Sequence, residues 1–157
     1  MGEKETARLH QVPDRQRSTV RLITVEIIDR VAEDAPALIQ PAQAAELLCR
    51  LIGDKDREHF VALHLDVRHR VIAAETVSIG SLNQSLVHAR EVFKAAILNN
   101  AHAILCGHNH PSGDLTPSPE DQAVEARLRD AGRLLGIPLL DFVIVSGSRY
   151  WAREENR

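Results

Sequence analysis

Apolar residues recur along this chain with two spacings, one typical of helices and one typical of strands. Four apolar side chains in residues 41–52 follow the i, i+3, i+4, i+7 spacing of an amphipathic helix: Ala44, Leu47, Leu48 and Leu51. A proline opens this segment and Gly53 follows it, which favours a helix start and a helix end at these points. Helical spacing also predicts helices over residues 18–33, 88–99 and 118–135. In residues 18–33 alternating β-branched side chains leave a strand open as an alternative.

Other segments have the patterns of strands. Residues 59–66 alternate between two faces, one of which carries Val61 and Leu63. Residues 68–70 have the composition of a hairpin turn. Residues 103–106 form a continuous apolar run, which suits a central strand buried on both faces. The predicted strands are 59–66, 71–79, 103–106, 139–145 and a short last strand around Tyr150.

This order of elements predicts the fold class. Strand–helix–strand connections indicate a partly parallel sheet, and the hairpin at residues 68–70 adds an antiparallel pair. We therefore expect an α/β fold with a mixed β-sheet flanked by helices. A chain of 157 residues is long enough for one domain with its own core. We assign residues 1–17 to a flexible polar arm, residues 18–152 to a single domain and residues 153–157 to a polar tail.

Composition narrows the class of function. Hydrophobic residues make up 44% and charged residues 26%, which excludes disorder, coiled coil and membrane span as descriptions of the whole chain. The net charge is −3, so the chain has no overall positive charge to attract nucleic acid. Only 3% of residues are aromatic, so few side chains could stack on bases. Two cysteines and the lack of an apolar leader predict a cytoplasmic protein that does not contact a membrane.

The residues best suited to chemistry lie around residues 107–121. His108 and His110 follow a predicted strand directly, and their spacing lets both imidazoles point the same way on extended backbone. A loop rich in proline and glycine then leads to a helix whose first turn contains Asp121. Two histidines and one carboxylate form a three-ligand metal set that leaves a fourth tetrahedral position for water.

Each part of this group also has a simpler interpretation. Residues 118–121 are a normal helix start, in which Ser118 caps the helix and Asp121 answers the cap. This does not exclude the metal role, because Asp121 could cap weakly or not at all while it binds a metal. Asp114 is a competing carboxylate, although its setting is typical of an exposed turn. Cys106 lies close enough to be a ligand, but an apolar strand predicts a buried, inert thiol. His64 is interpreted as a core or rim histidine.

The string of residues 108–121 resembles a known signature. His-X-His-Pro, six residues and then Ser-X-X-Asp is the motif of the JAMM (MPN-plus, JAB1-type) zinc metalloproteases. Residues 87–94 (VHAREVFK), 108–114 (HNHPSGD) and 139–141 (LLD) are similar to the bacterial RadC family, especially its short members. The resemblance covers about residues 18–150 and implies the MPN/JAB architecture, which is similar to that of cytidine deaminases.

The resemblance also implies a function and its residues. His108, His110 and Asp121 match the ligands of one Zn²⁺ per chain, and Ser118 matches a serine that helps to hold the oxyanion. Glu58 matches the glutamate that acts as general acid and base, with Glu75 and Glu91 as alternatives. The expected reaction is hydrolysis of a peptide or isopeptide bond in a peptide or protein substrate by zinc-activated water.

Three positions depart from the RadC pattern. Phe142 stands where relatives commonly have histidine, Ala89 stands where a proline is usual, and the chain from Trp151 onward is atypical. None of them belongs to the metal motif. Two other functions stay open: a non-catalytic MPN-type interaction module, and a DNA-associated repair or mobile-element factor. A local basic patch would serve the latter, although nucleic acid is not the partner that the composition favours. Its residues would be Arg68, His69, Arg70, Arg127, Arg129 and Arg133.

Overall fold

The computed structural model describes residues 37–38, 40–80 and 87–154. The predicted arm at residues 1–17 and the predicted helix at 18–33 lie outside these residues. So does most of the loop predicted after residue 80.

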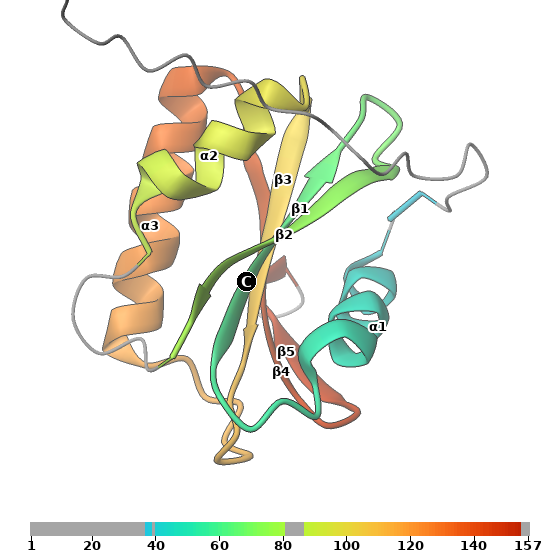
Figure 1. The fold of residues 1–157 in the computed structure, drawn as a ribbon, viewed down its shortest axis with the longest axis vertical. Helices are drawn as coiled ribbons and strands as arrows, with labels where there is room; N and C mark the ends of the chain where they lie inside the picture. The colour runs from blue at the N-terminus through green and yellow to red at the C-terminus, as the bar shows by residue number, and fades with distance from the viewer. Residues whose placement is uncertain (1–36, 39, 81–86, 155–157) are drawn as a thin grey trace, which may run out of the picture.

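Five strands form one mixed sheet (Figure 1). In spatial order they are β2 (Val71–Ile79), β1 (His59–Leu65), β3 (Ala103–Asn109), β4 (Leu139–Ser146) and β5 (Arg149–Ala152). The β3–β4 pair is parallel and the other three pairs are antiparallel. The mixed sheet and the order of elements along the chain confirm the predicted α/β class.

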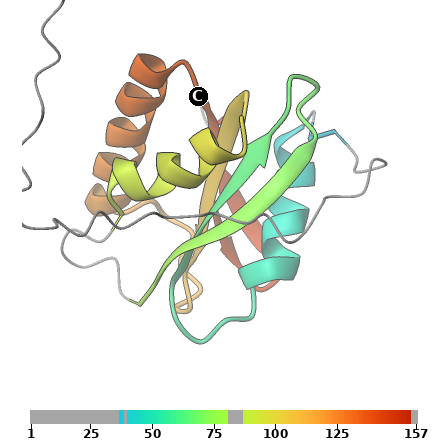
Figure 2. The ribbon, with the colours of Figure 1, turned by 45° about the horizontal axis from the view of Figure 1, so that its top comes forward.

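Helices cover both faces of this sheet (Figure 2). On one face lies α1 (Pro41–Ile52), whose bounds agree with the predicted helix. On the other face lie α2 (Ala89–Leu98) and α3 (Pro119–Leu135), each within a residue or two of its prediction. The sheet is therefore the middle layer of three, which is why its central strands are buried on both sides.

The alternation along β1 divides the core in two. Phe60 and Ala62 pack in the cluster under α2 and α3, whereas Val61 and Leu63 pack in the cluster under α1. On the α1 side, Gly107 lies where the helix approaches β3 closely. A Cβ atom on Gly107 would lie 2.4 Å from a methyl carbon of Leu48, so only glycine fits there without a shift.

The predicted strand at residues 103–106 is too short. In the structure β3 continues to Asn109, so His108 lies within the strand and not in a loop beyond its end. The reason is ladder pairing on both sides: His108 is opposite Phe60 of β1 and Ile144 of β4. The polar His108 and Asn109 follow the apolar run in the sequence, but the ladder pairing of β3 continues through them.

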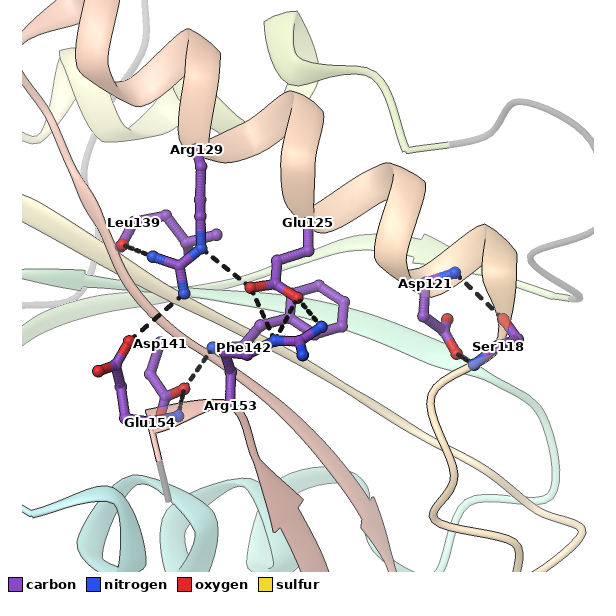
Figure 3. A network of polar contacts seen from close by, with 9 residues as sticks. All are labelled: Ser118, Asp121, Glu125, Arg129, Leu139, Asp141, Phe142, Arg153 and Glu154. Atoms are coloured by element: carbon purple, nitrogen blue, oxygen red, sulfur yellow. Dashed lines mark hydrogen bonds and ion pairs between the residues drawn. The ribbon is translucent and has the colours of Figure 1, made fainter. Parts of the chain in front are cut away.

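A network of ion pairs around the buried Glu125 connects residues 153 and 154 to α3 (Figure 3). Glu125 is almost fully buried and accepts hydrogen bonds from Arg129 at 2.9 Å and from Arg153 at 2.7 Å. Asp141 at the start of β4 accepts a hydrogen bond from the backbone N–H of Glu154 at 3.1 Å. Residues 153 and 154 are thus packed on the domain. In the part of the chain that the structure describes, no helix has the length and apolar character needed to cross a bilayer.

Candidate metal centre

His108 is held in β3 with its imidazole fully buried. Its ring stacks on Phe60 at a centroid distance of 6.1 Å and meets Phe142 of β4 at 5.5 Å. The Nδ1 atom of His108 has no hydrogen-bond partner among the described residues. Since apolar rings surround the imidazole, its direction is set by packing, and its Nε2 atom points to the other members of the site.

His110 lies one step beyond β3 and is held by two hydrogen bonds. Its backbone N–H donates to the carbonyl of Val145 at 2.9 Å, which continues the parallel pairing of β3 with β4. Its Nδ1 atom faces the carbonyl of Asp114. Because a carbonyl only accepts, Nδ1 carries the hydrogen, and in the neutral ring Nε2 has a lone pair that can bind a metal. Arg149 anchors the same loop by donating to the carbonyl of Gly113 at 2.8 Å.

Asp121 reaches the site from the first turn of α3. Its Oδ2 atom accepts a hydrogen bond from the backbone N–H of Ser118 at 2.8 Å, and its own N–H donates to Ser118 Oγ at 3.1 Å. Asp121 and Ser118 form a complete capping box, so the interpretation of residues 118–121 as a normal helix start is confirmed (Figure 3). The cap uses one carboxylate oxygen only, so the other can serve the site.

Three ligand atoms converge at this point. The Nε2 atoms of His108 and His110 are 2.8 Å apart, and Asp121 Oδ1 lies 3.0 Å from His108 Nε2. Asp121 Oδ2 lies 3.5 Å from His110 Nε2. One ligand atom from each residue falls within a group no wider than 4.8 Å. In the described part of the chain, no other group of three histidine, cysteine or carboxylate side chains comes this close together.

The electrostatics of the site favour a cation. Burial opposes ionisation of Asp121, but hydrogen bonds from His108 and His110 outweigh it and hold the pKa of the carboxyl well below its ordinary value. The hydrogen bond with Asp121 raises the pKa of His110, against its partial burial. Asp121 Oδ1 is buried and faces His108 Nε2 at 3.0 Å. A buried, ionised oxygen beside two imidazole nitrogens is the donor set that divalent metals bind.

The three glutamates considered from the sequence lie in different places. Glu58 directly precedes β1, two residues before Phe60, which is opposite His108 in the ladder, so Glu58 lies beside the end of β3. Its charge is one of the smaller causes that raise the pKa of His110. Glu75 points from β2 to the buried His64, with 4.0 Å between Glu75 Oε2 and His64 Nε2. Glu91 is on α2 and forms an ion pair with Lys94 at 2.9 Å.

The other candidate ligands lie apart from this group. Asp114 is exposed and its carboxylate accepts a hydrogen bond from the backbone N–H of Thr116 at 2.9 Å, as expected of a turn. Cys106 is fully buried, and burial raises the pKa of its thiol, which agrees with an inert cysteine. His64 is a core histidine, whose Nδ1 atom lies 2.8 Å from the side-chain nitrogen of Asn99.

Two arginines of the possible basic patch have acidic partners. Arg129 pairs with Glu125, and Arg133 forms an ion pair with Asp130 at 3.3 Å. These pairs reduce the positive field that the patch could offer to nucleic acid.

Sequence reasoning missed Asn109, which lies between the two histidines and is fully buried. Its side-chain oxygen accepts from the backbone N–H of His59 at 2.7 Å. Its side-chain nitrogen donates to the carbonyls of Lys55 at 3.1 Å and Arg57 at 2.9 Å. The one available signal was its place within the motif, since its partners are more than 45 residues away in the sequence.

Comparison with known proteins gives a consistent result. Residues 38–157 match the family described as RadC-like JAB domain. The chain is 48% identical over 120 residues to a UPF0758 protein of Shouchella clausii, covering 76% of this chain and 52% of that protein. It is 49% identical over 119 residues to a UPF0758 protein of Finegoldia magna, covering 76% and 53%. The match thus spans about half the length of these relatives.

Proposed function

Because the chain belongs to the RadC-like JAB domain family, we propose that it is a zinc-dependent hydrolase that cleaves a peptide or isopeptide bond. One observation carries this proposal: two imidazole Nε2 atoms and a carboxylate oxygen of the buried Asp121 converge within a group no wider than 4.8 Å. His108, His110 and Asp121 would hold the ion. When bound, zinc supplies a Lewis acid that activates water and polarises the scissile carbonyl.

Glu58 is the general acid and base of the proposed reaction. Its charge acts on His110, whereas Glu75 faces His64 and Glu91 faces Lys94. Glu58 takes a proton from the attacking water and gives it to the leaving amine, so that the amine leaves without a negative charge. The Glu75 carboxylate contacts the core histidine His64, and Glu91 pairs with Lys94 on the exposed side of α2. Neither is therefore our candidate for this proton transfer.

Ser118 stabilises the oxyanion of the proposed reaction. Its Oγ atom accepts a hydrogen bond from the N–H of Asp121, which fixes the hydroxyl at the N-terminus of α3. The hydroxyl hydrogen remains available, because accepting a bond does not use it. Ser118 donates this hydrogen to the oxygen on which negative charge develops, and the positive end of the helix dipole adds to the effect.

Metal content decides first between a hydrolase and a non-catalytic module. We would purify the protein without chelator or His-tag and measure bound metals by elemental mass spectrometry, beside His108→Ala. A matched control is His64→Gln, which changes another fully buried histidine of the same sheet face. We expect about one zinc per chain in the wild type and in His64→Gln, and none in His108→Ala. Well-folded wild-type protein that takes up no zinc when zinc is offered would support a module that binds a partner without catalysis.

Activity is tested separately from metal binding. We would screen the zinc-loaded protein against a quenched-fluorescence peptide library and an isopeptide-linked reporter. Glu58→Gln should keep zinc and lose hydrolysis, whereas Asp121→Ala should lose zinc. Normal hydrolysis by Glu58→Gln would remove Glu58 from the mechanism and leave the metal site intact.

A further inference from the structure

Asn109 has an unusual position for a fully buried polar side chain. It is the last residue of β3, and its neighbours on both sides are proposed metal ligands. Because side chains alternate along a strand, Asn109 points away from the face on which His108 lies. It therefore does not reach the ligand group, and its role must come through what it contacts on the other side.

Among the described residues, the side-chain hydrogen bonds of Asn109 all go to one short segment, residues 55–59. The oxygen accepts from His59 N–H at 2.7 Å, and the nitrogen donates to the carbonyls of Lys55 and Arg57 at 3.1 and 2.9 Å. Both hydrogens of the amide are used and one lone pair of its oxygen is used. Three good bonds from one buried side chain hold this irregular segment against the end of the metal-binding strand.

Glu58 is the residue between two of these contacts. Asn109 holds the carbonyl of Arg57 on one side of Glu58 and the N–H of His59 on the other. From the opposite direction, the backbone N–H of Gly80 donates to the carbonyl of Glu58 at 2.9 Å. The backbone around Glu58 is thus held from both sides.

Asparagine suits this position because its short side chain ends in a carbonyl oxygen, which accepts a hydrogen bond, and an NH2 group, which donates two. Aspartate has the same shape, but it would place an oxygen against the carbonyls of Lys55 and Arg57 and would repel them. Leucine has a similar volume and would leave the N–H of His59 and both carbonyls without these partners. The pattern of bonds, and not the volume of the side chain, distinguishes asparagine here.

We propose that Asn109 is a positioning residue that holds Glu58 over the metal centre. The assignment rests on the proposed function, because it is Glu58 that would transfer the proton. The motif then contains two kinds of residue: its histidines hold the ion, and the asparagine between them positions the general base, which directly precedes a different strand, β1.

The first test measures the position of the segment without any use of activity. Amide hydrogen exchange of His59 is compared in wild type, Asn109→Leu and Asn109→Asp. We expect exchange at least about 10-fold faster in Asn109→Leu, because the acceptor of this N–H is lost. Asn109→Asp keeps that acceptor, so it should protect His59 better than Asn109→Leu. The control, Asn99→Leu, removes the amide next to His64 and should leave His59 exchange unchanged.

The second test asks whether Asn109 acts through Glu58. In zinc-loaded protein and with a peptide cleaved by the wild type, Asn109→Leu should lower kcat about 10²-fold, with zinc content and KM nearly unchanged. In a Glu58→Gln background the same change should cost less than about 2-fold, because the residue that it positions is already disabled. If Asn109→Leu does not fold, Asn109→Asp provides the same cycle.

The outcomes separate this inference from the proposed function. Unchanged His59 exchange in Asn109→Leu, or losses in kcat that multiply fully in the double variant, would overturn the positioning role. A wild type that binds zinc and hydrolyses nothing, but whose protected His59 amide is exposed by Asn109→Leu, would refute the hydrolase and uphold Asn109 as the support of residues 55–59.

Discussion

Ser118 and Asp121 are joined by two reciprocal hydrogen bonds at the start of α3, of 2.8 and 3.1 Å. The pair does two things at once. It satisfies two backbone N–H groups of the helix start, and it fixes the carboxylate so that Oδ2 faces the cap and Oδ1 faces His108. A common helix start is thus also the third arm of the candidate metal site.

Asp121→Asn separates these two roles. An amide oxygen can still accept from Ser118 N–H, so the metal-free variant should lose less than about 1 kcal/mol of stability. Its neutral amide is a poor metal ligand. In thermal unfolding, zinc at 100 times its dissociation constant should stabilise the wild type by about 2.7 kcal/mol and Asp121→Asn by much less.

The control for this measurement is Asp114→Asn, which changes an exposed carboxylate of the adjacent loop. It should keep the full effect of zinc on the unfolding temperature. Equal stabilisation of Asp121→Asn and the wild type by zinc would show that Asp121 is not a ligand.

Substitutions of Ser118 distinguish its role in helix capping from its proposed role in catalysis. Ser118→Ala should cost about 1 kcal/mol in urea unfolding, because the N–H of Asp121 loses its acceptor. Ser118→Gly should cost only a few tenths of a kcal/mol, since glycine is itself a good N-cap. Both variants lack the hydroxyl and should lose about 10²–10³-fold in turnover. A fully active Ser118→Gly enzyme would exclude Ser118 from oxyanion binding.

How far the sequence predicts this structure depends on the range of the interactions. The bounds of α1 and the cap at Ser118 follow from residues within one or two turns, and both predictions are confirmed. The end of β3 is set by pairing with β1 and β4, so the polar His108 and Asn109 looked like loop residues. Asn109 was missed for the same reason, because Lys55 and His59 are near it only in the folded chain.

Arg153 is expected to stabilise the domain through its contact with the buried Glu125, which the sequence did not indicate. It donates to Glu125 at 2.7 Å and lies over the ring of Trp151, with 4.9 Å between the guanidinium carbon and the ring centroid. In Arg153→Ala the nearly buried Glu125 would keep its hydrogen bond from Arg129 but lose those from Arg153. We expect this variant to lose about 1–3 kcal/mol of unfolding free energy in urea.

Arg133→Ala is the matched control for Arg153, because its ion pair with Asp130 is exposed on both sides. It should change the free energy of unfolding by about 0.5 kcal/mol or less. The comparison asks whether burial of the acidic partner decides the strength of these pairs. Similar losses in the two variants would mean that the contact of Arg153 with Glu125 adds little to stability.

Asp141 makes stability depend on pH in a direction that can be predicted. Burial raises the pKa of its carboxyl; the charge of Glu154 adds to this, while two backbone hydrogen bonds and Arg129 oppose it. Its Oδ2 atom is buried and has no hydrogen-bond partner in the described chain. Since the folded protein holds this proton more tightly than the unfolded chain, stability falls as pH rises from the ordinary carboxyl pKa, about 3.9, towards the raised value.

Asp141→Asn removes the titrating group but keeps an oxygen that can accept from the N–H groups of Phe142 and Glu154. We would measure urea unfolding from about pH 3 to about pH 8. The stability of Asp141→Asn relative to the wild type should rise as pH passes from the ordinary carboxyl pKa to the raised value, and then level off. Asp141→Ala should be less stable than Asp141→Asn at every pH, because both hydrogen bonds are lost, but it should follow the same pH dependence. A stability difference between Asp141→Asn and the wild type that is constant with pH, or that falls as pH rises, would show that the Asp141 carboxyl is not held protonated by burial.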